Sequence, residues 1–465
     1  MKVTTPTRTS HQLFQLDAYQ ICSLVDIFPY LVNSKNIVYQ KGASEQLPNK
    51  FTGLSEMSVL SIKYSSFVIF IYAIGSQFTD VTIGVLKLWE LLILFIFPLI
   101  IRKSHKEFIP LIVFFTFLLS LSFIAAFYPT SAYSNYSGLK SKYIISLARF
   151  IEIMLCISSA IVIMNLVTNK KESGRSLISK FISYNFYLSL LILIIFCVDI
   201  AIGTDFVSYG TMHRLKGFYV EGGPYGLFIS TLFFLELIGN RRIIYILTFS
   251  LIMGLAQSKS GIVSLSVFLT VYFMMKNKIL RSFLIPRNFI KFSFFIVFSL
   301  LVSSYTIYKV AYNYIADINN YREILKERHD DNSFVMGRIA ASYIGPKIFA
   351  DNPIIGVGLG AYSLVRNDAK YRSEFPEVEG WDLTGLGGML TLLIENGIFG
   401  FLGFIFIIAR LFRFDIIGVI FIALFFIPFI LGAQLYMFYP WVYLGFYMTI
   451  KYKDNVNKNP SLIKQ

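Results

Sequence analysis

Apolar runs long enough to cross a bilayer recur along most of this chain. A membrane-spanning helix needs about 20 consecutive apolar residues, with a range of roughly 17–25. Runs of this kind, some of them shorter, begin near Val59, Val81, Phe108, Tyr143, Phe181, Tyr225, Ile243, Gly261, Phe292, Leu386, Ile416 and Tyr436. Because 55% of the 465 residues are hydrophobic, a soluble domain could not bury them all. The sequence therefore predicts an all-α membrane protein, a bundle of about 12 transmembrane helices.

The charged residues predict how these helices are oriented. With twelve spans, every basic cluster between the runs falls on one side of the membrane, and the positive-inside rule makes that side cytoplasmic. The clusters comprise Arg102, Lys103, Lys106, Lys170, Lys171, Arg175, Arg241, Arg242, Lys276, Lys278, Arg281, Arg287, Arg410, Arg413, Lys451 and Lys453. This distribution explains the net charge of +15 without a nucleic-acid partner.

The runs and loops together predict the organisation of the chain. Residues 1–56 form a cytoplasmic N-terminal segment, with the first span near Val59 acting as an uncleaved anchor. Residues 57–314 hold the first nine spans, with a short outer loop at 203–224. Residues 315–385 form a long outer loop, residues 386–450 hold the last three spans, and residues 451–465 form a cytoplasmic tail. We expect a helix along the membrane surface between Phe334 and Phe349, which ends before Asn352-Pro353.

Ionisable residues inside apolar runs are costly and indicate either structural pairs or functional sites. Arg149 and Glu152 lie three residues apart in the fourth run and share one helix face. They are either an internal ion pair or part of a site. Lys87 and Glu90 repeat the spacing in the second run, where we favour a structural pair. Lys259 lies in a polar notch on the outer side, either as a solvated turn or as the wall of a cavity.

The two outer loops carry cations beside glycine-rich turns. In the first loop, Arg214 and Lys216 precede Glu221 and a Gly222-Gly223-Pro224 turn. Guanidinium and ammonium groups bind phosphate oxygens, so these two cations are candidates for binding a diphosphate. In the second loop, Arg338 lies on the predicted surface helix and precedes Gly356, Gly358 and Gly360. That glycine run follows a helix on the side without nucleotides, which argues against a nucleotide-binding loop.

The three cysteines, Cys22, Cys156 and Cys197, do not form a disulfide framework or a metal-binding spacing, and we expect no metal or other cofactor.

Taken together, the motifs resemble the O-antigen polymerase and ligase superfamily across residues 57 to 450. The family's arginine–glycine–proline element resembles Arg214, Gly217, Glu221 and Pro224. Its loop arginine and its Asn-Pro-x-x-Gly-x-Gly-x-Gly turn resemble the set Arg338, Asn352, Pro353, Gly356, Gly358 and Gly360. Glu395, Gly397 and Gly400 resemble its glutamate-and-glycine span, and Ser258 to Gly261 resembles its serine–basic–glycine element.

The resemblance implies a GT-C-like helical glycosyltransferase of the bacterial inner membrane, with its active site facing the periplasm. The donor it implies is a glycan held on undecaprenyl diphosphate. Candidate diphosphate-binding residues are Arg214, Lys216, Arg338 and Arg149, and candidate general bases are Glu221 and Asp382. A regulator of polysaccharide chain length is a possible partner.

One departure separates two activities within the superfamily. Its ligases carry a histidine near the end of the long outer loop, and this chain has none there; its outer-loop histidines are His213 and His329. We therefore favour a polymerase that joins lipid-linked repeat units over a ligase that transfers glycan to lipid A-core. A lipid-linked glycan flippase is a further alternative, although no internal repeat typical of transporters is visible.

Overall fold

The fold is described from a computed structural model. It describes residues 52–83, 86–96, 106–126, 141–168, 173–209, 213–276, 340–373 and 385–458, together with residues 323, 337, 375, 377 and 378. The chain divides into two units, residues 1–56 and 57–465, and the second unit contains the elements that follow, apart from residues 52–56 at the start of α3.

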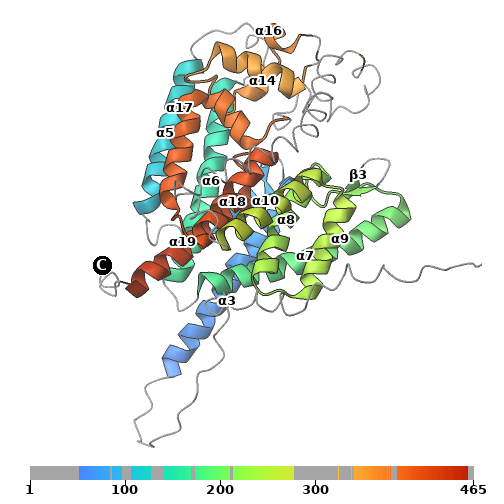
Figure 1. The fold of residues 1–465 in the computed structure, drawn as a ribbon, viewed down its shortest axis with the longest axis vertical. Coiled ribbons are helices and arrows are strands. Elements are labelled where there is room, and N and C mark those ends of the chain that lie inside the picture. Colours follow the sequence, from blue (N-terminus) through green and yellow to red (C-terminus); the bar gives the residue numbers. More distant parts are fainter. Residues whose placement is uncertain are drawn as a thin grey trace, which may run out of the picture. The chain divides into compact units, whose positions relative to one another are not determined.

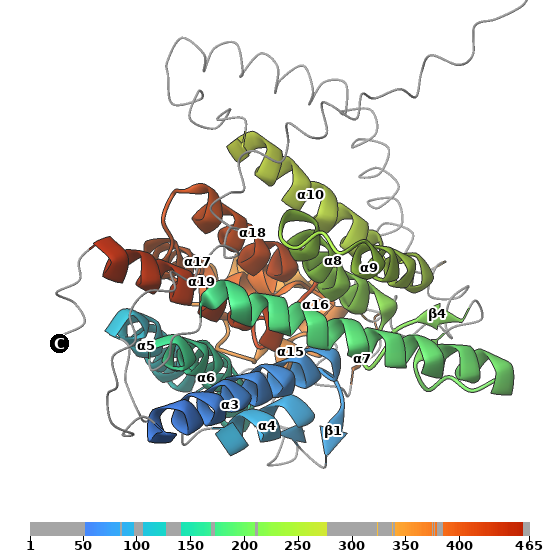
Figure 2. The ribbon, with the colours of Figure 1, turned by 90° about the horizontal axis from the view of Figure 1, so that it is seen from below.

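Helices make up most of the second unit (Figures 1 and 2). The first group comprises α3 (Thr52–Gln77), α4 (Leu88–Ile96), η2 (Lys106–Phe108), α5 (Ile109–Ala126), α6 (Lys142–Thr168), α7 (Gly174–Ile202), α8 (Gly222–Ile238), α9 (Ile243–Ala256) and α10 (Lys259–Lys276). The second group comprises α14 (Ala340–Asp351), α15 (Tyr362–Val365), α16 (Ala369–Arg372), α17 (Gly388–Leu411), α18 (Ile416–Leu431) and α19 (Phe438–Lys458). Two short antiparallel hairpins pair β1 (Thr82–Ile83) with β2 (Leu86–Lys87), and β3 (Ser208–Tyr209) with β4 (Arg214–Leu215).

The described helices confirm a helical membrane protein but do not confirm twelve crossings. Among the described residues, four helices are long and apolar enough to span a bilayer: α5 with its preceding η2 turn, α6, α7 and α17. Three shorter apolar helices are α8, α9 and α18. The run predicted to begin near Phe292 lies outside the described residues.

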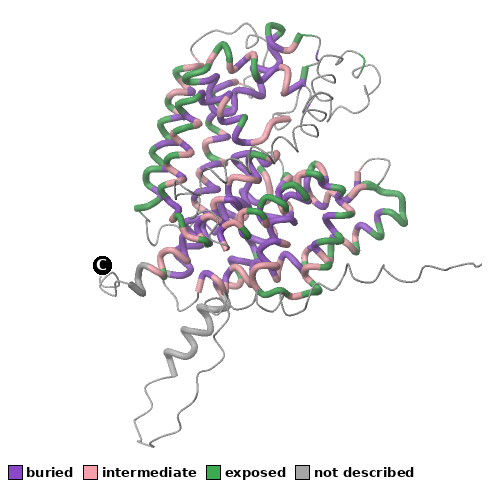
Figure 3. Tube along the Cα trace, viewed as in Figure 1, coloured by how far each residue is buried: buried purple, intermediate pink, exposed green. Residues whose placement is uncertain are grey.

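Two helices, α6 and α19, form the centre of the packing. The most apolar window of α6 is 72% buried by protein, whereas those of α5 and α7 are 33% buried. α19 packs against α6, α7 and α18, and its residues from Phe438 to Met448 other than Pro440 and Gly445 are buried bulky apolar or aromatic side chains. A helix that is apolar on all sides belongs inside a bundle. Figure 3 shows the contrast, with exposed positions along α5 and buried ones through the centre.

Helix α17 is broken at Gly397, and a neighbouring segment of chain occupies the break. Gly397 has a φ of 63°, in the left-handed region that favours glycine. The freed N–H of Ile398 donates to the carbonyl of Pro353 at 2.9 Å, and the N–H of Gly358 donates to the carbonyl of Glu395 at 2.7 Å. The turn from Asn352 to Gly360, called the glycine turn below, is therefore hydrogen-bonded to the middle of a membrane helix. The sequence predicted only close helix packing at these glycines.

Close packing at a second place joins α8 to α10. A Cβ on Gly226 would lie 2.2 Å from the Cβ of Ser258, and one on Gly261 would lie 2.6 Å from the carbonyl oxygen of Gly226. The Ser258 hydroxyl donates to the carbonyl of Gly223 at 2.9 Å and accepts from the N–H of Gly261 at 3.0 Å. Two of the motifs that carry the family resemblance are therefore in direct contact.

Helix α14 ends at Asp351, as the Asn-Pro sequence predicts. Its apolar face packs against α16 and α17, and Figure 1 shows α14 and α16 at one end of α5, α6 and α17.

Candidate functional site

A small pocket, partly open to solvent, lies between α6, the glycine turn, α17 and the segment before α19. Its charged lining residues are Arg149 and Glu395, and polar groups from Ser363, Thr391 and Gln434 also face it. Arg149 and Glu395 each lie about two turns from the N-terminal end of their helix. A mostly apolar pocket with a few convergent polar groups is the common form of a small-molecule site.

Arg149 is held in place from three sides. Its guanidinium donates to the carboxylate of Glu152 at 2.6 Å and lies 3.9 Å from the ring centre of Tyr436. The turn contacts its aliphatic part, because a Cβ on Gly360 would lie 2.6 Å from the Arg149 Cγ. Arg149 itself is 6% exposed. A guanidinium that is clamped and buried in this way is suited to recognising an anion with little rearrangement.

The pairs predicted separately at Lys87–Glu90 and Arg149–Glu152 form one cluster in the structure. The ammonium group of Lys87 lies 3.7 Å from the Glu152 carboxylate and 4.7 Å from the ring centre of Tyr436. The backbone N–H of Lys87 donates to Glu90 at 2.9 Å. The end of β2, directly before α4, therefore supplies a second cation beside Arg149.

Glu395 fixes the glycine turn against α17. Its carboxylate accepts hydrogen bonds from the backbone N–H groups of Gly360 and Tyr362 and interacts electrostatically with Arg149. The turn is also tied to α5 and α6. The N–H of Leu359 donates to the Ser122 hydroxyl, and the Ser146 hydroxyl donates to the carbonyl of Leu359, both at 2.7 Å. Four segments that are distant in sequence thereby converge on one wall of the pocket.

The first-loop candidates lie together, but in another part of the fold. Arg214 is in β4, where its guanidinium donates to the carbonyls of Ala256 and Gln257 at the end of α9, each at 3.2 Å. Lys216 follows β4, and Glu221 immediately precedes α8. Figures 1 and 2 both show the β3–β4 hairpin well apart from α6. The structure thus brings Arg214, Lys216 and Glu221 together and separates them from Arg149.

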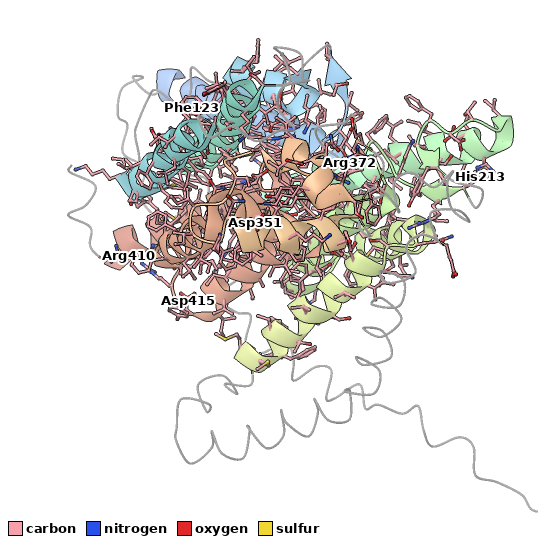
Figure 4. All side chains as sticks on the ribbon, turned by 90° about the horizontal axis from the view of Figure 1, so that it is seen from above. Phe123, His213, Asp351, Arg372, Arg410 and Asp415 are labelled. Carbon is pink, nitrogen blue, oxygen red and sulfur yellow. The ribbon has the colours of Figure 1, made fainter. Side chains whose placement is uncertain are left out.

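A buried carboxylate organises that hairpin. Asp199, near the end of α7, accepts hydrogen bonds from the backbone N–H groups of Phe206, Val207 and Ser208, each at 3.0 Å. His213, at the tip, lies at the edge of the molecule, away from Asp351 and Arg372 (Figure 4). Arg338, Asp382 and His329 lie outside the described residues.

The α14–α16 region carries charged groups with shifted titration behaviour. Hydrogen bonds from Lys370 and Tyr371 lower the pKa of the Asp351 carboxyl. Burial raises the pKa of the Tyr362 hydroxyl to about 12 and lowers the pKa of the Arg366 guanidinium. The Tyr362 hydroxyl is buried and makes no hydrogen bond within the part of the chain that the structure describes. No group of three His, Cys, Asp or Glu side chains in that part could hold a metal ion.

Sequence reasoning identified Arg149 as a candidate but did not place Glu395, Lys87 or Tyr436 in the site. Glu395 carried a usable signal, since it is an ionisable residue inside an apolar run and precedes the Asn396-Gly397 break. Tyr436 carried none, because it became significant only through its contact with Arg149.

Residues 244–405 match the sequence model of a family described as O-antigen ligase. No curated protein and no solved structure gives a significant match to the chain. The matched region contains Ser258 to Gly261, the Asn352 to Gly360 turn and Glu395 to Gly400, which carry three of the four motif resemblances. The chain is therefore a membrane protein whose residues 244–405 match an O-antigen ligase family domain, which supports the resemblance to the O-antigen polymerase and ligase superfamily.

Proposed function

We propose that the protein is a polymerase that joins oligosaccharide repeat units carried on undecaprenyl diphosphate, at the periplasmic face of the inner membrane. The observation that carries the proposal is the Arg149 pocket, where a clamped cation lies beside the family's glycine turn and glutamate span. The predicted orientation puts the N-terminal ends of α6 and α17, and the segment before α19, on the outer side of the bilayer. That is the side on which the donor would be presented.

The proposed reaction needs stabilisation of a leaving diphosphate. A hydroxyl oxygen of one repeat unit attacks the anomeric carbon of another, and the bond from that carbon to the diphosphate oxygen breaks. The hydroxyl proton passes to a general base, and undecaprenyl diphosphate leaves with the bonding electrons. Arg149 would stabilise the negative charge that develops on the diphosphate. Glu395, through its two backbone hydrogen bonds, would keep the turn and Arg149 in position.

The general base remains a prediction with two candidates. Asp382, which lies outside the described residues, precedes the pocket-lining Gly388 by six residues in the sequence. Glu221 lies beside the β3–β4 hairpin, apart from Arg149, and would require the acceptor to reach across to it. Arg214 and Lys216 would then bind the lipid-linked glycan away from the Arg149 pocket, and Arg338 stays a candidate for the diphosphate.

The test uses a cell that lacks the native gene and expresses Arg149→Ala or Arg149→Lys, with surface polysaccharide resolved on a gel. We expect Ala to abolish long chains and Lys to restore them in part, because Lys keeps the charge but loses the fork that binds two oxygens. Lys453→Ala, at an exposed position, is the matched control for removing a cation. Normal long chains with Arg149→Ala would refute the assignment.

The same cells separate polymerase from ligase, the activity named in the matched family's description. Loss of a polymerase leaves single repeat units attached to lipid A-core. Loss of a ligase leaves lipid A-core bare while lipid-linked chains accumulate. The absence of a histidine at the end of the outer loop supports the first outcome.

A further inference from the structure

Two cations and two carboxyl groups form a cluster that includes Arg149, one of the residues lining the pocket. Lys87 ends β2 and Glu90 lies in the first turn of α4, whereas Arg149 and Glu152 come from α6, and α4 packs against α6. A single carboxylate, that of Glu152, contacts both cations, at 2.6 Å from Arg149 and 3.7 Å from Lys87. Both cations also lie over the ring of Tyr436. Lys87 is thus connected to Arg149 through Glu152 and through Tyr436.

The net charge of this cluster depends on whether Glu90 and Glu152 are both ionised. It is 3% exposed; one carboxyl oxygen accepts the backbone N–H of Lys87 at 2.9 Å, and the other is buried with no hydrogen-bond partner among the described groups. Two carboxyl groups in one poorly solvated cluster repel each other unless they share a proton. A proton on one of the two carboxyl groups removes that repulsion. The cluster then holds two positive charges and one negative charge.

Resting on the proposed function, we propose that Lys87 is a positioning residue that leaves the cluster around Arg149 with a net positive charge toward the diphosphate. Glu152 holds the guanidinium in place but also offsets its charge. Because the Lys87 ammonium shares the same carboxylate, one positive charge of the cluster is left for the ligand. If the Lys87–Glu152 salt bridge were only structural, replacing both residues would harm the protein at least as much as replacing one. In the proposed role, the double replacement is tolerated because the net charge around Arg149 is unchanged.

The charge count is tested with Lys87→Met, Lys87→Arg and the double variant Lys87→Met/Glu152→Gln in the full chain, purified in detergent. The probe is undecaprenyl diphosphate, and undecaprenol reports binding through the lipid tail alone. We expect Lys87→Met to weaken diphosphate binding about tenfold, the scale of one charge-assisted hydrogen bond, and Lys87→Arg to retain it. The double variant should recover most of the loss, because Arg149 is again left with one net positive charge. Lys453→Met, at an exposed position in α19, is the control for deleting a lysine elsewhere.

Two results would overturn the inference: unchanged affinity in Lys87→Met, or a double variant that binds no better than Lys87→Met. If Lys87→Met is too unstable to purify, Lys87→Gln replaces it, since it keeps a hydrogen-bond donor for Glu152 without the charge. Arg149→Met separates the two proposals. Normal diphosphate binding by Arg149→Met would refute the proposed function itself. Loss of binding in Arg149→Met with none in Lys87→Met would refute only the role of Lys87.

Discussion

Gly360 joins the backbone of the turn to the side chain of Arg149. Its φ is 73°, and an added Cβ would lie 2.6 Å from the Arg149 Cγ and 2.9 Å from the Ile145 Cγ2. We expect Gly360→Ala to destabilise the protein by about 2–4 kcal/mol, from left-handed strain and overpacking together, and to abolish long polysaccharide chains. Thermal unfolding in detergent and the polysaccharide gel measure the two effects.

Gly203 provides the matched control for that substitution. Its φ is 75°, almost the same as that of Gly360, but nothing lies within 4 Å of an added Cβ. Gly203→Ala therefore carries the strain without the clash, and we expect a cost of about 1–2 kcal/mol with normal chain length. If the two variants had equal unfolding temperatures and equal polysaccharide chain lengths, the contact of Gly360 with Arg149 would be unimportant for function.

For single residues, the sequence could identify a charge whose burial costs free energy, but it could not identify the side chains that contact that charge. Arg149 was a candidate because a charge inside an apolar run requires an explanation. Its partners Tyr436 and Lys87 lie far from it along the chain, and no spacing rule joins them. For Arg214, the position beside a Gly-Gly-Pro turn predicted a phosphate site. In the structure its guanidinium binds the carbonyl groups that end α9, a common use of arginine at a helix C-terminus.

Two helix glycines test the packing of α8 against α10. A Cβ on Gly226 would lie 2.2 Å from the Ser258 Cβ, whereas nothing lies within 4 Å of one on Gly254 in α9. We expect Gly226→Ala to destabilise the bundle by about 1–3 kcal/mol or more. Gly254→Ala should be neutral or stabilising by up to about 1 kcal/mol, because alanine favours the helix. Unfolding midpoints in detergent compare the two, and a tolerated Gly226→Ala would mean that the helices can separate without cost.

The contact between α14 and α16 provides a pH-dependent element outside the membrane helices. Lys370 donates to Asp351 at 2.5 Å and Tyr371 donates to it at 2.9 Å, and these bonds lower the pKa of Asp351 and raise that of Lys370. The lowered carboxyl pKa means that the contact is complete above about pH 4 and is lost as the pH falls further. The raised lysine pKa means that the contact is lost only above about pH 10.5.

We therefore expect this contact to be constant between about pH 5 and pH 9 and to loosen at pH 3. Hydrogen exchange of the α16 amides, corrected for the intrinsic effect of pH, reports the change. Asp351→Asn should show loosened α16 amides at pH 6 and little further change at pH 3. Similar exchange of the native protein and the variant at pH 6 would contradict the assignment.

At the scale of elements, periodicity and apolar length predicted most helices, because burial in lipid or protein depends on local composition. They did not predict the break in α17. Glycines at 397 and 400 are equally compatible with a continuous helix, and only the carbonyls of Pro353 and Ile354, which bind the freed N–H groups, make the break stable. Such information lies in tertiary contacts rather than in the apolar run itself.

The arrangement of the whole chain across the membrane rests on the positive-inside rule and can be measured directly. Lys259 and Arg410 are both exposed and are predicted to lie on opposite sides. In a chain with its three native cysteines replaced, we expect Lys259→Cys to react with a membrane-impermeant maleimide in intact spheroplasts. Arg410→Cys should react only after permeabilisation. The reverse pattern would invert the topology and put the Arg149 pocket on the cytoplasmic side.

The wall of the pocket that holds Tyr436 is synthesised long after the wall that holds Arg149. Tyr436 lies two residues before α19, which packs between α6 and α18. An incomplete translation product can therefore contain the arginine but not the aromatic ring that holds it. The complete pocket would therefore form only after α19 has been synthesised and packed against α6, and polypeptides truncated before Tyr436 would lack the ring that contacts Arg149.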